Sequence, residues 1–214
     1  GGTGKNRLYG DAGDDTITSA GTHDVVDAGE GDNDITITSS ATGGSYTSGD
    51  GLDKYLVESG VSSVIHIDAG NGSNQITIKD NAKVTKITTG DNNDTINAEG
   101  DVGQINTGSG VDTLNLGIIS DLVDTGSGDD TIIATGKIGR KVWRGDTGFG
   151  NAGIRAGEGD DTIELSGGSY YRVNKSYHSH GSTIYGEGGN DSINLTGNQS
   201  YGPIHGDSGD DIID

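Results

Sequence analysis

The sequence predicts an all-β protein in which short parallel strands stack into a solenoid. A phrase rich in glycine and aspartate returns along the whole chain, and aliphatic or aromatic residues recur at about every ninth position. β-Branched residues alternate after many copies of the phrase, as in Ile35 and Ile37 or Ile76 and Ile78. Alternation indicates strands rather than helices. Self-similarity at a fixed period indicates a repeat fold.

The clearest copy of the phrase is TGSGDDTI at 125–132, and we number its positions from one at Thr125 to eight at Ile132. It returns with little change at 156–163 and 206–213. More degenerate copies occupy 28–35, 48–55, 69–76, 89–96, 107–114 and 186–193. A further copy ends at Ile17. Each copy combines a glycine-rich loop with the start of a strand.

The apolar residues that close each phrase, or stand just before the next, mark out the predicted turns. They are Leu8, Ile17, Val26, Ile35, Tyr46, Tyr55, Ile67, Ile76, Ile87, Ile96, Ile105, Leu114, Val123, Ile132, Ile154, Ile163, Ile184, Ile193, Ile204 and Ile213. The step that contains the phrase is always nine residues, whereas the other step varies from nine to 22. One edge of constrained length and one that tolerates insertions is what a solenoid predicts.

We therefore expect residues 1–214 to form one solenoid of about ten turns of 18–21 residues. Two turns are longer, because they carry insertions at 134–153 and 166–183. The sequence begins and ends inside a repeat, so we expect it to be a piece of a longer repeat array.

Composition narrows the possible partners and the cellular setting. The formal charge is −20, from 33 acidic and 13 basic residues, so nucleic acid is not expected to bind and divalent cations are the natural counter-charge. The chain has no cysteine, which fits a bacterial protein exported to the cell surface or the medium without disulfides. No apolar run is long enough to span a membrane.

The sixth position of the phrase holds the candidate metal ligands. Alternate glycines let the backbone adopt positive φ and turn carbonyl oxygens inward, where a sixth-position carboxylate can share an ion with them. Oxygen donors without cysteine suit Ca²⁺. The sixth-position residues are Asp15, Asn33, Asp53, Asn74, Asp94, Asp112, Asp130, Asp161, Asp191 and Asp211. The loop carbonyls are expected near Gly13, Gly31, Gly51, Gly72, Gly110, Gly128, Gly159 and Gly209.

The phrase resembles the nonapeptide G-G-x-G-x-D-x-U-x of the RTX, or hemolysin-type calcium-binding, proteins. The resemblance covers nearly the whole chain, although only about half of each turn matches. It implies a right-handed parallel β-roll, or β-helix, that binds multiple Ca²⁺ ions between the loops of adjacent turns. It also implies that loop carbonyls and the sixth-position residues above are the ligands.

Three departures from the family pattern modify this expectation. Asn33 and Asn74 replace aspartate, which weakens the charge at their sites. Asn92 stands where the fourth-position glycine is expected, and asparagine tolerates left-handed backbone better than most residues. On the opposite edge only Asp24 and Asp121 keep an acidic sixth position, with Gly103 replacing it and Asn6 a partial match. We therefore expect calcium along one edge and few or no ions along the other.

An alternative without metal remains open for the sixth-position residues. Asp, Asn and Gly also form Asx-turns at tight corners, where the side chain bonds its own backbone. One copy of the phrase would favour that explanation, but ten copies in register favour calcium.

The two insertions differ chemically from the rest of the chain, since they combine basic and aromatic residues. A candidate ligand patch is formed by Arg140, Lys141, Trp143, Arg144, Tyr170, Tyr171, Arg172 and Tyr177. Such a patch suits an anionic polysaccharide or a protein partner. Alternatively, the insertions fold over each other and cover the degenerate edge.

Three functions follow from these observations. The first is a calcium-stabilised structural segment of a large secreted or surface protein, such as an adhesin, an S-layer protein or an extracellular filament, in which neighbouring copies can stack. The second is a binding module that uses the basic aromatic insertions. The third is an accessory module of an exported enzyme. We expect no catalysis in this chain, because the sequence shows no set of nucleophile, base and orienting residue.

Overall fold

The computed structural model describes residues 1–61, 64–139, 153–167, 182–196 and 201–214. These residues form β-strands joined by loops and contain no helix, so none that could cross a membrane. The strands are β1 (Arg7–Tyr9), β2 (Thr16–Ser19), β3 (Asp24–Asp27), β4 (Asp34–Ile37), β5 (Gly44–Thr47), β6 (Lys54–Val57), β7 (Ile65–Asp68), β8 (Gln75–Ile78), β9 (Lys83–Asp91), β10 (Thr95–Ser109), β11 (Thr113–Ile119), β12 (Leu122–Asp124), β13 (Thr131–Ala134), β14 (Gly153–Glu158), β15 (Thr162–Leu165), β16 (Thr183–Gly188), β17 (Ser192–Leu195), β18 (Ile204–Ser208) and β19 (Ile212–Ile213).

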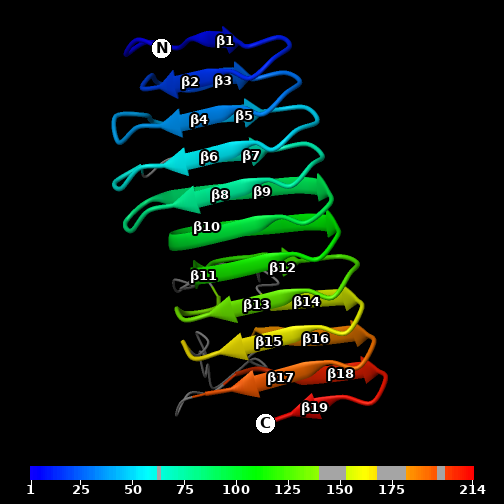
Figure 1. The fold of residues 1–214 in the computed structure, drawn as a ribbon. Coiled ribbons are helices and arrows are strands. Elements are labelled where there is room, and N and C mark those ends of the chain that lie inside the picture. The colour runs from blue at the N-terminus through cyan, green and yellow to red at the C-terminus, as the bar shows by residue number, and fades with distance from the viewer. Residues whose placement is uncertain (62–63, 140–152, 168–181, 197–200) are drawn as a thin grey trace, which may run out of the picture.

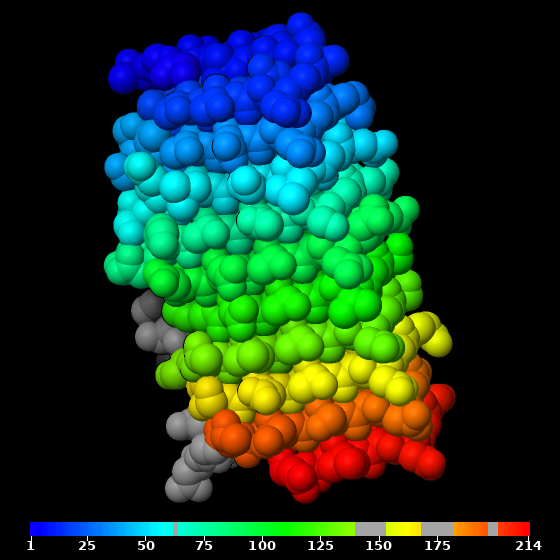
Figure 2. All heavy atoms as spheres, in the orientation of Figure 1, coloured from blue at the N-terminus to red at the C-terminus, as the bar shows by residue number. Residues whose placement is uncertain are grey.

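The strands stack in two faces of a column (Figure 1), and all their pairings are parallel. The column follows the order of the sequence from one end to the other (Figure 2). In most of the column each strand pairs with the strand two further along the chain, as β2 does with β4. One level of the column, called a rung below, therefore holds one strand from each face and the loop between them. The expected all-β parallel solenoid is confirmed.

The apolar marks of successive strands on the same face pair with each other, so their spacing in the sequence sets the strand register. Ile35 pairs with Tyr55 and Tyr55 with Ile76 on one face. On the other face, Val26 pairs with Tyr46 and Tyr46 with Ile67. The marks thus form two files, one on each face, that run the length of the column.

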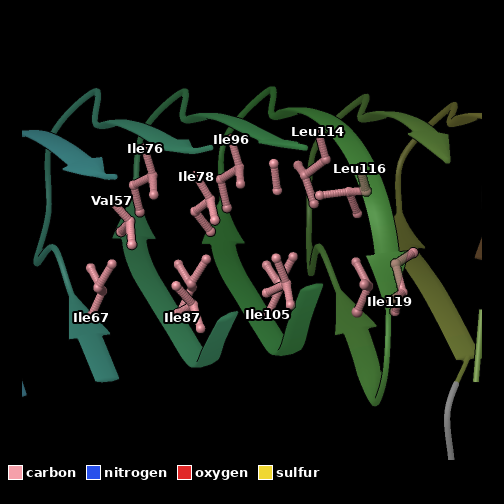
Figure 3. Packing of buried hydrophobic residues seen from close by; sticks show 14 of the residues in the cluster. Val57, Ile67, Ile76, Ile78, Ile87, Ile96, Ile105, Leu114, Leu116 and Ile119 are labelled. Atoms are coloured by element: carbon pink, nitrogen blue, oxygen red, sulfur yellow. The ribbon is translucent and has the colours of Figure 1, made fainter. Parts of the chain in front are cut away.

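The core lies between the two faces, where the files of marks meet (Figure 3). Every mark from Ile17 to Ile193 is buried, whereas Leu8, Ile204 and Ile213 in the end rungs keep some exposure. Tyr46 and Tyr55 are fully enclosed and their hydroxyl groups hydrogen-bond Ser19 Oγ at 3.0 Å and Ser48 Oγ at 2.8 Å. The thin continuous core predicted from the sequence is confirmed.

The middle of the column departs from the expected short strands. β10 is 15 residues long and pairs with β8 through its first part and with β9 through its second. Both steps between marks are nine residues here, but the same step joins Ile17 to Val26, where β2 and β3 are separate strands, so step length does not explain the long strand. Gly103 lies at the corner opposite the phrase, where a Cβ would lie 2.2 Å from the Thr85 carbonyl oxygen, so the chain passes closely over β9 at this point.

The phrase loops follow β1, β3, β5 and their successors and stack along one edge, on the right in Figure 1. This stacking brings equivalent positions of successive phrases next to each other. The candidate site is therefore a repeated edge rather than a single pocket.

Candidate metal-binding edge

The fourth position of every phrase adopts a left-handed backbone conformation. Its φ ranges from +79° at Asn92 to +149° at Gly51. Asn92 thus keeps the loop conformation that glycine gives elsewhere, as expected from its tolerance of this region. The second position is also left-handed in most phrases, and acidic residues occupy it at Asp11, Glu187 and Asp207 with φ between 70° and 79°. Sequence reasoning did not single out those three residues.

The sixth-position residues form one continuous chain of hydrogen bonds, which we call the sixth-position ladder. In each rung the backbone N–H of the sixth residue donates to Oδ1 of the sixth residue in the next rung, at 2.7–3.1 Å. The ladder connects Asp15, Asn33, Asp53, Asn74, Asp94, Asp112, Asp130, Asp161, Asp191 and Asp211. The aspartate oxygens bond the neighbouring rung, which differs from the Asx-turn alternative, in which they would bond their own turn.

The second carboxylate oxygen of the ladder aspartates has no partner. Oδ2 is buried without any hydrogen bond at Asp15, Asp53, Asp94, Asp112, Asp130, Asp161 and Asp191. The position-one hydroxyls of Ser48, Thr89, Thr107 and Thr125 act to lower the pKa of four of these carboxyls, but each donates its hydrogen to a carbonyl oxygen of the next rung. A buried carboxylate oxygen without a donor is costly, because it has lost its water and gained nothing in return. A proton or a bound cation would remove that cost.

The pKa values of the ladder carboxyls also show that their charged form is unfavourable. Burial raises the pKa of Asp94 and of Asp161 to about 7 and the pKa of Asp130 to about 6. Burial also raises the pKa of Asp53, Asp112 and Asp191 above the ordinary range. The charged form of these groups is therefore disfavoured in the folded protein unless a positive charge lies beside it.

Backbone carbonyls provide the other oxygen donors at this edge. In the described residues no hydrogen bond reaches the fourth-position carbonyl oxygen of any rung that has aspartate at position six, such as Gly110 or Gly128. Nor do three His, Cys, Asp or Glu side chains gather anywhere in the described part to hold a metal by themselves. One carboxylate and backbone carbonyls per rung form a donor set of hard oxygens, which fits Ca²⁺.

The two asparagine rungs have the same ladder bonds but a different second atom. Asn33 Nδ2 donates to the carbonyl oxygens of Gly31 at 2.9 Å and Gly29 at 3.3 Å. Asn74 Nδ2 donates to Gly72 at 3.0 Å and Gly70 at 3.4 Å. In both rungs the acceptors are positions four and two of the same phrase. The sequence predicts only a weaker charge in these rungs, and the amide contacts are an additional feature of the structure.

On the opposite edge Asp24 is buried with both carboxylate oxygens bonded. Oδ1 accepts from the backbone N–H and from Nδ2 of Asn6, both at 2.8 Å. Oδ2 accepts from Ser19 Oγ at 2.6 Å and from the Gly21 N–H at 3.1 Å. Burial acts to raise the pKa of Asp24, but the hydrogen bonds from Ser19, Asn6 and Gly21 outweigh it and the net pKa is lowered. The carboxylate is thus stabilised without an ion, whereas Asp121 on the same edge is exposed.

Substitution of Ser19 by alanine is expected to destabilise the protein by about 1–3 kcal/mol, because two buried polar groups lose a partner. Asp24 Oδ2 would lose its hydroxyl donor, and the buried Tyr46 hydroxyl would lose its contact with Ser19 Oγ. Urea unfolding measures the change. The exposed Thr18→Ala on the same strand is the control, and equal effects of the two variants would contradict the role given to Ser19.

The candidate ligand patch lies outside the described residues. This applies to Arg140, Lys141, Trp143, Arg144, Tyr170, Tyr171, Arg172 and Tyr177, so its assignment to a polysaccharide or a partner stays a prediction.

Comparison with known proteins gives one match. The family model of the RTX calcium-binding nonapeptide repeat matches residues 1–35 and 182–198, in four copies. No curated protein and no solved structure matches the chain. The matched ranges contain the rungs of Asp15, Asn33 and Asp191, and the same ladder continues through the unmatched region between them.

Proposed function

Because the chain carries RTX calcium-binding nonapeptide repeats and so binds multiple Ca²⁺ ions, we propose that its ladder aspartates are the side-chain ligands. The chain is then a structural β-roll segment whose folding depends on Ca²⁺. We place it in a large secreted or cell-surface protein of the adhesin, S-layer or filament type. In such a protein, neighbouring copies of the segment could stack.

The observation that carries this proposal is the row of buried, unpartnered Oδ2 atoms. Seven carboxylates of one edge share this defect, from Asp15 to Asp191. One buried oxygen without a partner could be a local exception, but the same unpaired atom in successive rungs indicates a common ligand. Ca²⁺ supplies positive charge that hard oxygen donors can share.

The residues of each aspartate rung have separate tasks in this proposal. Oδ1 of the aspartate holds the previous rung in register through the ladder, and Oδ2 is left for the ion. The position-four carbonyl, which accepts no hydrogen bond, supplies a further oxygen, and left-handed backbone at position four shapes the loop. The position-two carbonyl already accepts a backbone N–H of the next rung, at 2.9 Å for Asp11 and 3.0 Å for Gly108, and it supplies its second lone pair. Bound ions would also offset part of the charge of −20, which otherwise repels the compact state.

An extracellular setting agrees with these features. Sites of this type in extracellular modules bind Ca²⁺ with dissociation constants on the order of 10⁻⁴ to 10⁻³ M. Calcium then acts as a folding signal after export, because the apo chain carries glycine entropy and unpaired charge. The absence of cysteine is compatible with export, since no disulfide is needed.

A calcium titration followed by far-UV circular dichroism tests the proposal. Signal characteristic of β-structure is expected to grow cooperatively with Ca²⁺, to disappear in EGTA and to stay absent in equimolar Mg²⁺. Mg²⁺ demands tighter octahedral geometry and dehydrates reluctantly. Equal β-signal in EGTA and in Ca²⁺ would contradict calcium-driven folding.

The apo protein is expected to gain stability as the pH falls from 7.5 to 5, and Ca²⁺ affinity is expected to fall. The folded pKa of Asp94 and Asp161 is about 7, above the ordinary aspartate value of about 3.9. The folded apo state therefore binds more protons than the unfolded state in this window, so raising the pH destabilises it. Protons also compete with Ca²⁺ for the same oxygens.

Far-UV circular dichroism of the protein in EGTA at both pH values measures the first effect, because protonated ladder carboxyls should restore part of the β-signal at pH 5. Isothermal titration calorimetry at both pH values measures the second. A β-signal in EGTA that is weaker at pH 5 than at pH 7.5 would show that the ladder carboxyls do not have raised pKa values.

A further inference from the structure

We propose that the side-chain amides of Asn33 and Asn74 take the place of a calcium ion, so that these two rungs are closed without metal. The inference rests on the proposed function, because it assumes that the aspartate rungs bind Ca²⁺ through the same loop oxygens. It divides the sixth-position ladder into two chemically different kinds of rung.

The contacts of the two amides carry this inference. Each Nδ2 donates to the carbonyl oxygens of positions four and two of its own phrase, at 2.9 and 3.3 Å for Asn33 and 3.0 and 3.4 Å for Asn74. These are the carbonyls assigned to the ion in the aspartate rungs. A primary amide has two N–H donors, so one nitrogen can satisfy both oxygens.

The rest of each asparagine rung is unchanged. Asn33 Oδ1 accepts the Asp15 N–H at 3.0 Å, and Asn74 Oδ1 accepts the Asp53 N–H at 3.1 Å, as aspartate Oδ1 does elsewhere. Both residues are buried, with a relative exposure of 1% each. Asparagine and aspartate have the same shape, so Nδ2 corresponds to the orphaned Oδ2. The substitution therefore replaces an acceptor that needs a cation by a donor that needs none.

Asn6 shows the same contacts at an independent place. It occupies the sixth position of the phrase at the start of the chain, on the opposite edge from the ladder. Its Nδ2 donates to the carbonyl oxygens of Gly4 at 2.9 Å and Gly2 at 2.8 Å, again positions four and two, and shares its two hydrogens with a third acceptor, Asp24 Oδ1 at 2.8 Å. The arrangement thus belongs to asparagine in this loop and not to one rung of one edge.

The consequence is a broken calcium array. The aspartate rungs form an uninterrupted run from Asp94 to Asp211, whereas Asp15 and Asp53 are each separated from the next aspartate by an asparagine rung. Calcium dependence is then concentrated in the C-terminal part of the column. In the folded protein, the loops of the asparagine rungs need no ion, because the amides already bond their carbonyl oxygens.

Counting bound ions in the whole chain tests the inference. Asn74→Asp is expected to raise the number of Ca²⁺ ions bound at saturation by one, measured by equilibrium dialysis and elemental analysis. Asp112→Asn is expected to lower it by one and to keep the β-signal in circular dichroism, because the amide satisfies the carbonyls. Asn93→Asp is the matched control, since Asn93 is exposed, and its Oδ1 accepts a similar inter-rung bond from Val111.

The outcomes separate the inference from its premise. If the unmodified protein binds no Ca²⁺, the proposed function fails. If the unmodified protein binds Ca²⁺ but Asn74→Asp and Asp112→Asn leave the count unchanged, only the inference is overturned. The same holds if Asn93→Asp changes the count as much as Asn74→Asp. Should Asn74→Asp not fold, the loss of one ion in folded Asp112→Asn decides the question.

Discussion

Substitution of Gly128 by alanine is expected to destabilise the calcium-loaded protein by about 2–6 kcal/mol, the sum of backbone strain and overpacking. Gly128 has a φ of +125°, where an L side chain is strained. A Cβ there would lie 1.7 Å from the Gly110 carbonyl oxygen of the preceding rung, so the two loops would have to move apart. The displaced carbonyl is also one that we assign to a calcium ion, so the loss of Ca²⁺ affinity adds to the loss of packing.

Gly13→Ala separates the two contributions. Gly13 has a similar φ of +117°, but a Cβ there would meet nothing within 4 Å. Its substitution is expected to cost only the strain, about 1–3 kcal/mol. Urea unfolding in saturating Ca²⁺ measures both variants. Equal losses would show that the contact between successive loops contributes nothing to the cost at Gly128.

Asp112→Ala is expected to cost about 3–5 kcal/mol, in line with the loss of one member of a buried charged pair. The substitution removes Oδ1, which accepts the buried Asp94 N–H at 2.8 Å, and Oδ2, the proposed ligand. The first loss leaves a backbone donor unpaired and the second removes an ion. Asp112→Asn repairs the first and, if the asparagine inference is correct, also satisfies the carbonyls.

Chemical unfolding and calcium counting together test this prediction. Asp34→Ala, at an exposed position of β4, is the control for loss of negative charge. If Asp112→Ala is no more harmful than Asp34→Ala, the ladder does not hold the rungs together.

Much of the fold could be predicted from spacing alone. Strand period and phrase period together fix which residues face inward, so the marks gave both the register and the core from Ile17 to Ile193. Backbone rules also anticipated Asn92 at a left-handed position. These features depend on local geometry that recurs in every phrase, so a sequence pattern that is weak in one copy becomes reliable over ten.

Other features could not be predicted because they depend on which atoms meet across rungs. The sequence shows that Asn33 and Asn74 replace aspartate, but only coordinates show their amides on two particular carbonyls. The network of Ser19, Asp24 and Tyr46 joins residues five and 27 positions apart, so no motif reveals it. The length of β10 could not be predicted from the marks either, because the same nine-residue step joins the separate strands β2 and β3.

The hydrogen bonds of the ladder keep the same length whatever the number of residues between their partners. Asp112 and Asp130 are 18 residues apart and bonded at 2.7 Å, while Asp130 and Asp161 are 31 residues apart and bonded at 2.8 Å. Only the half-turn that contains the phrase has a fixed length, so the other half-turn can hold extra residues. We therefore expect the column to accept a foreign peptide between β13 and β14 or between β15 and β16. Longer and shorter grafts would leave the spacing of the metal-binding edge the same.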